Sequence, residues 1–164
     1  MIIADHEELE RTVARIRGEG RRVVFTNGVF DLLHVGHIRY LQEARATGDC
    51  LLVAVNADSS VRSFKGDLRP IVPAAERGEV LDSLRCVDLV TYFDSRTPAP
   101  LVERLQPDIY VKGGDYRVED LPEAAIVRRY GGEVRILVLV PGRSTTDIIG
   151  KICAAYGQDN KPEG

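Results

Sequence analysis

Five short apolar runs, spaced along the whole chain, constrain its fold more than any other feature. They lie at residues 23–25, 51–55, 87–90, 109–111 and 134–140. Val, Ile and Leu dominate these runs and do not alternate with polar residues, which is typical of parallel strands covered on both faces. We therefore expect five buried parallel strands with helices packed over them.

Segments with a helical period separate the apolar runs, at residues 5–17, 36–47, 74–84, 99–105, 122–130 and 145–153. Asp5 and Glu8 can cap the first of them in the manner of a capping box. The alternation of strand and helix predicts an α/β protein, a Rossmann-like, doubly wound five-stranded parallel sheet with helices on both faces. We expect a single domain over residues 1–157 and a disordered polar tail over residues 158–164.

The composition of the 164 residues excludes some partners and indicates a compartment. The chain is 44% apolar and 29% charged with a net charge of −3, which argues against a nucleic-acid or membrane surface. Its three cysteines show no metal-binding spacing, and no signal peptide or long apolar run is present. These features predict a cytoplasmic location, where thiols stay reduced.

The sequence after the first predicted strand, from Thr26 to His37, has the features of a phosphate-binding turn. A strand, a glycine turn and a helix start together place unpaired N–H groups and the positive end of a helix dipole at one point. His34 and His37 are two of only three histidines in the chain. Gly36 between them allows a ligand to approach the backbone closely. The turn residues expected to surround a phosphate-bearing ligand are Thr26, Asn27, Gly28, Phe30 and Gly36.

Two other interpretations of the histidine pair remain open. Residues three apart share a helix face, so His34 and His37 could hold a metal ion, but no acidic or cysteine partner is arranged beside them. Either histidine could instead be structural, with its hydrogen bonds satisfied inside the fold. The surrounding glycine turn favours a role facing phosphates, and we expect no metal site made by protein ligands.

Polar or glycine-marked segments also follow three of the other predicted strands. They are residues 56–58 after the second, 112–116 after the fourth and 142–146 after the fifth. Because the carboxyl ends of parallel strands meet at one edge of a sheet, these segments and the 26–37 turn should form a single cleft. Ser144, Thr145 and Thr146 can both cap the last helix and present hydroxyls at its positive end.

Several of these segments together resemble a known enzyme family. Asn27-Gly28-Val29-Phe30-Asp31 followed by His34-Val35-Gly36-His37 resembles the signature of the HxGH nucleotidyltransferases, in particular their cytidylyltransferase-like group. Residues 112–116 (KGGDY), 143–146 (RSTT), 65–66 (KG) and 69–71 (RPI) narrow the resemblance to the adenylyltransferases of ADP-heptose synthesis. It runs from about Arg21 to Ile152.

The resemblance implies that AMP is transferred from ATP, with Mg²⁺, to D-glycero-β-D-manno-heptose 1-phosphate by direct in-line displacement, giving ADP-heptose and pyrophosphate. It also implies a homodimer and a separate sugar kinase that supplies the substrate. The residues implied as catalytic are His34, His37 and Lys65. Those implied to bind the nucleotide are Thr26, Asn27, Gly28, Phe30, Gly36, Arg143, Ser144, Thr145 and Thr146. Those implied to bind the sugar phosphate are Asn56, Asp58, Lys112, Gly113 and Asp115.

Other functions and roles stay open at this point. Residues 139–143 replace the Arg-Thr-Glu-Gly-Ile run of the glycerol-phosphate cytidylyltransferases, which favours adenine over cytosine. The alternatives are a cytidylyltransferase or adenylyltransferase for another phosphorylated alcohol, such as glycerol 3-phosphate, and a non-catalytic nucleotide-binding module.

Asn56 and Asp58 could simply cap the next helix. Lys65 is expected in a flexible segment. Arg77 and Arg85 match arginines of the cytidylyltransferase pattern, but either could be a surface or dimer-contact residue.

Overall fold

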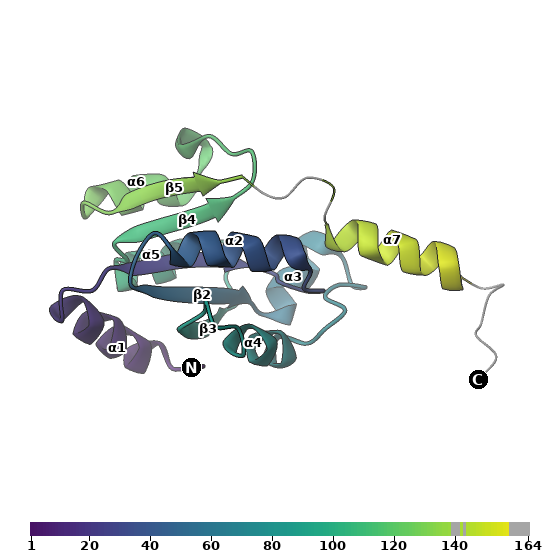
Figure 1. Ribbon diagram of the computed structural model, residues 1–164, viewed down its shortest axis with the longest axis horizontal. Helices are drawn as coiled ribbons and strands as arrows, with labels where there is room; N and C mark the ends of the chain where they lie inside the picture. Colours follow the sequence, from purple (N-terminus) through teal and green to yellow (C-terminus); the bar gives the residue numbers. More distant parts are fainter. Residues whose placement is uncertain (139–141, 143, 158–164) are drawn as a thin grey trace.

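The computed structural model describes residues 1–138, 142 and 144–157, and it contains a five-stranded parallel sheet (Figure 1). The strands are β1 (Val23–Gly28), β2 (Cys50–Asn56), β3 (Leu89–Phe93), β4 (Ile109–Gly113) and β5 (Glu133–Leu137). All neighbouring pairs run parallel, in the order β3-β2-β1-β4-β5. The predicted fold class is therefore confirmed. The expected tail at residues 158–164 lies outside the described residues.

The strand order places β1, the first strand of the chain, at the centre of the sheet. From β1 the chain builds outward through β2 to β3, and then returns across the sheet to add β4 and β5 on the other side. The direction of winding thus reverses between β1 and β4. In open sheets of this kind, ligands bind at such a reversal, beyond the carboxyl ends of the strands.

β1, β2 and β4 extend one to three residues beyond their predicted runs, and β3 and β5 are shifted relative to theirs. β3 begins at Leu89 rather than at residue 87, because Asp88 turns the chain there: its backbone N–H donates to the Leu51 carbonyl and its carboxylate accepts from the Leu51 N–H. β5 ends at Leu137, and Val138 beyond it is exposed. The remainder of the fifth predicted run lies outside the described residues.

The helices follow the predicted segments with one addition. They are α1 (His6–Gly18), α2 (Val35–Arg45), α3 (Asp58–Lys65), α4 (Ala74–Asp82), α5 (Ala99–Leu105), α6 (Pro122–Arg129) and α7 (Thr145–Tyr156), with a 3₁₀ turn at Val118–Asp120. Asp5 caps α1 as expected, accepting hydrogen bonds from two backbone N–H groups of the first turn. α3 was not predicted, because its eight residues include only two apolar ones, Val61 and Phe64, and bury only Ser60 and Val61.

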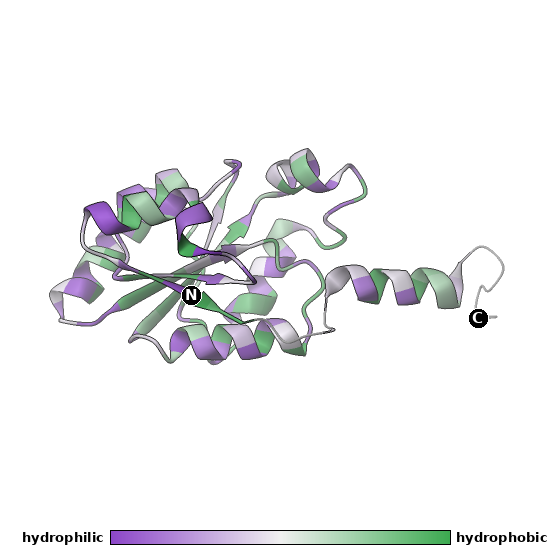
Figure 2. Ribbon diagram, turned by 90° about the horizontal axis from the view of Figure 1, so that it is seen from above, coloured by the Kyte–Doolittle hydropathy of each residue, from purple (hydrophilic) through white to green (hydrophobic). Residues whose placement is uncertain are grey.

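The sheet is covered on both faces, as the non-alternating runs predict. Val23 and Phe25 face a cluster that includes residues of α1, α5 and α6, whereas Val24 faces a second cluster that includes residues of α2 and α4. Figure 2 shows the hydrophobic strands running between the helices. No described helix combines the length and the apolar character needed to cross a membrane. The three cysteines are free thiols.

Candidate active site

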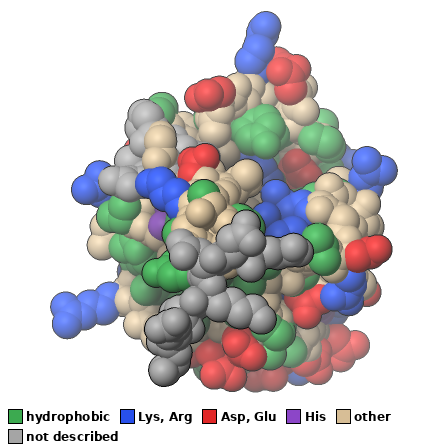
Figure 3. Space-filling view, turned by 90° about the vertical axis from the view of Figure 1, so that its right-hand side faces the viewer, with side chains coloured by type: hydrophobic (Ala, Val, Ile, Leu, Met, Phe, Trp, Pro, Cys, Tyr) green, Lys and Arg blue, Asp and Glu red, His purple; other side chains and the backbone are tan. Residues whose placement is uncertain are grey.

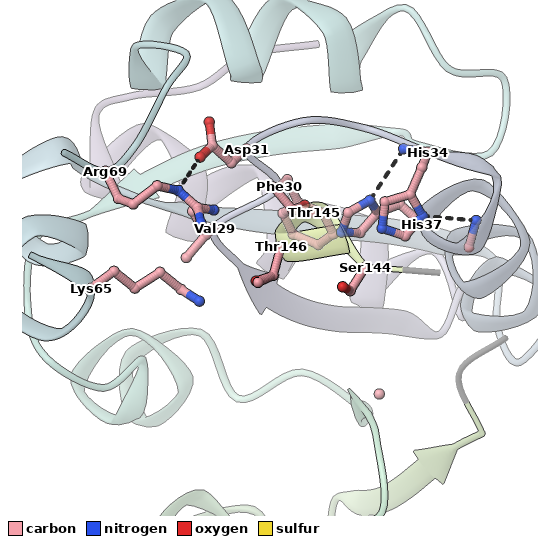
Figure 4. A pocket seen from close by; sticks show the side chains of 12 residues that line it. Val29, Phe30, Asp31, His34, His37, Lys65, Arg69, Ser144, Thr145 and Thr146 are labelled. Carbon is pink, nitrogen blue, oxygen red and sulfur yellow. Dashed lines mark hydrogen bonds and ion pairs between the residues drawn. The ribbon is translucent and has the colours of Figure 1, made fainter. Parts of the chain in front are cut away.

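A cavity of about 400 Å³ lies where β1 ends and α2 begins. Figure 4 shows Lys65 and Arg69 approaching it from one side and the two histidines from the other. Nine of the predicted site residues line it, namely Phe30, His34, Gly36, His37, Lys65, Gly113, Ser144, Thr145 and Thr146. The structure thus brings together residues from the ends of β1 and β4 and from the starts of α2 and α7.

The two histidines are held with their Nε2 atoms as hydrogen-bond donors. His34 caps α2, and its Nδ1 accepts from the Gly36 N–H at 3.1 Å. The Nδ1 of His37 accepts from the His34 N–H at 3.4 Å. A neutral imidazole that accepts at Nδ1 carries its proton on Nε2. The rings lie 4.0 Å apart between centroids, so one short stretch of backbone orients both.

The protonation of His37 fits this arrangement. Burial, and secondarily the nearby His34, lowers the pKa of His37 from 6.5 to about 4. His37 is therefore neutral at pH 7 in the free protein. A neutral Nε2–H can donate a hydrogen bond to a phosphate oxygen without placing a full charge in a partly buried site.

The turn before α2 is shaped by Phe30. This residue adopts a left-handed backbone conformation with φ of 49°, which is uncommon for a residue with a side chain. Its ring packs against His37, at 5.6 Å between centroids, and also against Gly28. A Cβ atom added to Gly28 would lie only 3.0 Å from that ring. Gly28 is thus needed for the ring to lie beside β1 and support His37.

Asp31 anchors the segment that carries Arg69 over the cavity. One carboxylate oxygen of Asp31 pairs with the Arg69 guanidinium at 2.7 Å, and the carboxylate also accepts from the Ile71 and Val72 N–H groups. Burial alone would raise the pKa of Asp31, but these hydrogen bonds outweigh it and lower the pKa. The acceptor capacity of this buried carboxylate is therefore already used.

Lys65 lies in a different local structure from the one expected. It is the last residue of α3 rather than part of a flexible segment, and Gly66 directly after it has a positive φ of 85°. Its side chain is exposed and extends towards the middle of the cavity (Figure 4). A helix end fixes the backbone of Lys65, while its long side chain can follow a ligand.

The start of α7 forms another wall of the cavity. Ser144 caps this helix by accepting from the Asp147 N–H at 3.0 Å, and the Thr145 hydroxyl donates to the Leu32 carbonyl at 3.2 Å. The positive end of the helix dipole consequently faces the cavity. Arg143, predicted for the same loop, lies outside the described residues.

A second cavity of about 340 Å³ opens on the other side of the β1 end. Asn27, Gly28, Asn56 and Lys112 line it among the predicted residues. The Lys112 ammonium donates to the Asn27 side-chain oxygen at 3.3 Å, and burial lowers the pKa of Lys112. A hollow of about 150 Å³ shares residues with both cavities, Lys112 and His37 among them. The two cavities therefore adjoin across the Gly28 turn.

Three predicted site residues line none of these spaces. Thr26 is buried beneath the site, 2.6 Å from the Tyr40 hydroxyl. Asp58 pairs with Arg77 at 2.7 Å and accepts from a backbone N–H of α4. Asp115 is exposed at the edge of the site. Their assignment to ligand binding stays a prediction.

Arg77 is neither a surface residue nor available for a dimer contact. Its side chain is completely buried. The guanidinium donates to the carbonyls of Val29, Asn56 and Val72 as well as to Asp58. It thus ties together the chain after β1, the end of β2 and the segment before α4, which all border the site.

The sequence interpretation missed three charged residues of the second cavity, namely Arg96, Asp120 and Glu123. Arg96 follows β3, and the rule that ligands meet the carboxyl ends of strands would have indicated it. Asp120 lies just before α6 and Glu123 in its first turn, where acidic residues are expected merely to complement the helix dipole. Figure 3 looks at the side to which the strands point, and basic side chains gather near its centre with acidic ones close by.

Comparison with known proteins identifies the family. A family model described as cytidylyltransferase-like matches residues 25–151, a range that contains both cavities. The chain belongs to the cytidylyltransferase-like family. It is a nucleotidyltransferase, as the motifs predict. Its relatives include the bifunctional protein HldE of Geobacter sulfurreducens, 49% identical over 90% of this chain, and that of Geobacter metallireducens, 50% identical over 87%.

The chain spans about a third or less of the length of these relatives, 30% and 29% respectively. Among solved structures, a lipopolysaccharide core biosynthesis protein from Thermoplasma volcanium is 32% identical with a TM-score of 0.60, covering 74% of this chain and 98% of that one. Pantothenate synthetase from Thermus thermophilus has the same TM-score at 18% identity, covering 85% of this chain and 62% of that one. The latter likeness concerns the fold alone.

Proposed function

We propose that this nucleotidyltransferase transfers AMP from MgATP to D-glycero-β-D-manno-heptose 1-phosphate, releasing pyrophosphate and forming ADP-heptose. The proposal rests on the pair of adjoining cavities, one with two histidine donors and a helix N-terminus, the other with the half-buried Lys112. The resemblance of the KGGDY and RSTT segments to the ADP-heptose enzymes supports the substrate. So does the similarity to a protein of lipopolysaccharide core biosynthesis.

The reaction requires positioning and charge neutralisation more than proton transfer. A phosphate oxygen of the sugar phosphate attacks the α-phosphorus of ATP, and the bond between that phosphorus and the pyrophosphate oxygen breaks. The attacking phosphate monoester has a second pKa of about 6 and is ionised at neutral pH, so no general base is needed. His34 and His37 donate from Nε2 to phosphate oxygens, and Lys65 supplies positive charge.

Magnesium enters this scheme with ATP rather than through protein ligands. Of the residues that the structure describes, Asp31 alone brings a carboxylate to the histidine cavity, and it already accepts from Arg69 and two backbone N–H groups. Among the described residues, no group of three or more His, Cys, Asp or Glu side chains could hold a metal ion. Oxygen atoms of the ATP phosphates and water suit Mg²⁺, which neutralises phosphate charge as part of the substrate complex.

The role of His37 is testable by its removal. His37→Ala should lower kcat by about 10²–10³, the usual cost of losing one donor to a developing negative charge. His6→Ala is the matched control, since the Nε2 of His6 hydrogen-bonds the Tyr92 carbonyl away from both cavities. Steady-state rates within a few-fold of wild type for His37→Ala would contradict the assignment.

The substrate assignment is tested by ³¹P NMR with the purified protein and Mg²⁺. One tube holds ATP and heptose 1β-phosphate, and parallel tubes hold CTP and glycerol 3-phosphate. We expect pyrophosphate and a new sugar diphosphate signal only with ATP and the heptose. Turnover only with CTP and glycerol 3-phosphate would replace the substrate pair, and no turnover in any tube would favour a nucleotide-binding module.

The free thiols support our further proposal of a reducing, cytoplasmic location.

A further inference from the structure

Glu123 is a buried acidic side chain that the proposed reaction does not explain. It is the second residue of α6, only 4% of it is exposed, and it lines the second cavity. No residue in the described ranges donates a hydrogen bond to its carboxylate. Its oxygens are not among the described side-chain atoms that are completely buried without a partner, so the carboxylate is accessible from the cavity and can accept hydrogen bonds there.

Neither the dipole of α6 nor the nearby Lys112 explains why Glu123 is buried. An acidic residue in the first turn complements the helix dipole, but it can do so from the surface without being buried. Lys112 also lines the cavity, and Glu123 partly offsets the effect of burial on the pKa of Lys112. However, the two do not approach to ion-pair distance, and the Lys112 ammonium instead donates to Asn27. The Glu123 carboxylate thus keeps its acceptor capacity on the cavity side.

The other residues that line the second cavity indicate which kind of ligand it suits. Two cations, Lys112 and Arg96, share it with two carboxylates, Glu123 and Asp120, and with the half-exposed ring of Tyr116. A site for a phosphate alone would gain nothing from carboxylates, which repel it. Ionised carboxylates only accept hydrogen bonds, so they suit a ligand that carries donors. A phosphate joined to a polyhydroxylated body satisfies both kinds of side chain.

We propose that Glu123 is a specificity residue that accepts hydrogen bonds from hydroxyl groups of the acceptor, selecting a sugar phosphate over a simple alcohol phosphate. The phosphate lies towards Lys112 and the adjoining histidine cavity, and the sugar ring extends into the second cavity towards α6. This inference rests on the proposed function, because it assigns the second cavity to the AMP acceptor.

The test compares Glu123→Gln with Glu119→Gln as a matched control. Glu119 lies in the neighbouring 3₁₀ turn with a side chain 63% exposed, and it does not line the cavity. Calorimetric titrations with heptose 1β-phosphate, hexose 1-phosphates and inorganic phosphate are made with a non-hydrolysable MgATP analogue present. We expect Glu123→Gln to weaken sugar phosphate binding about tenfold or more, the usual effect of losing hydrogen bonds to a charged group. Binding of inorganic phosphate should stay unchanged or tighten.

The outcomes separate this inference from the proposed function. Equal weakening of sugar phosphate and inorganic phosphate would mean that Glu123 acts through Lys112 or the fold, and would overturn the inference. An unchanged sugar phosphate affinity in Glu123→Gln would overturn it too, as would a wild-type protein that binds no sugar phosphate more tightly than inorganic phosphate. Glu123-dependent binding of a hexose 1-phosphate, with no binding or turnover of the heptose, would keep the inference and overturn the proposed substrate.

Discussion

Lowering the pH from 7 to 5 should destabilise the folded protein through His37, and replacing that histidine should remove the effect. The folded pKa is about 4, below the value of 6.5 for an unperturbed histidine. Between these values the unfolded chain binds a proton at this position and the folded chain does not. The free energy of unfolding therefore falls as the pH drops from 6.5 towards 4, and the loss is absent above about 6.5.

The size of the effect follows from the same values. One pKa unit corresponds to about 1.4 kcal/mol, and pH 5 lies about 1.5 below the unfolded pKa, which gives an upper limit of about 2 kcal/mol. Because His37 is only half-buried, solvent screening reduces this figure, and we expect about 1 kcal/mol. A change of this size is a measurable fraction of the stability of a domain.

Urea denaturation followed by circular dichroism at pH 7.5 and pH 5.0 measures the effect. The difference in unfolding free energy between the two pH values should be about 1 kcal/mol smaller in His37→Gln than in the wild type. His6→Gln, which removes a histidine outside both cavities, should keep the wild-type difference. An equal pH-dependent loss in the wild type and His37→Gln would refute the lowered pKa of His37.

Three further substitutions probe the site and its supports. Lys112→Ala should raise the KM for the sugar phosphate about tenfold or more with little change in the KM for ATP in steady-state kinetics, and a rise confined to ATP would mean that the two subsites are reversed. Asp31→Asn should destabilise the protein by about 1–3 kcal/mol in chemical denaturation, because Arg69 loses its charged partner, and an unchanged midpoint would contradict the anchoring role. Arg77→Met should cost about 3–5 kcal/mol, since Asp58 and buried carbonyls lose their donor; a loss below 1 kcal/mol in the same assay would show that the buried cluster is not structural.

The sheet was predictable because buried parallel strands leave a direct mark on the sequence. Their apolar runs do not alternate, and the polar segments after them mark the edge where ligands bind. This reasoning located the histidine turn and the start of α7. It placed β3 two residues too early, because the turn at Asp88 depends on hydrogen bonds to Leu51, 37 positions away in the chain.

Other parts of the site depend on contacts between distant residues that leave no local pattern. Asp31 and Arg69 are 38 positions apart, and Asp58 and Arg77 are 19 apart. An arginine within a helical segment is normally exposed, so nothing local indicated that Arg77 is buried. Glu123 follows Pro122 at a helix start, where an acidic residue is common, and only its burial distinguishes it.

The position of the two cavities suits an in-line displacement. They open on opposite sides of the turn at Gly28, and they adjoin at the hollow that His37 and Lys112 share. In the proposed reaction, the attacking oxygen and the departing pyrophosphate must lie on opposite sides of the α-phosphorus. Under the proposal, subsites on either side of the Gly28 turn would hold the two reactants in that relation with little further reorganisation. The reversal of winding between β1 and β4 creates this geometry, because it leaves space on both sides of the central strand where the chain turns away.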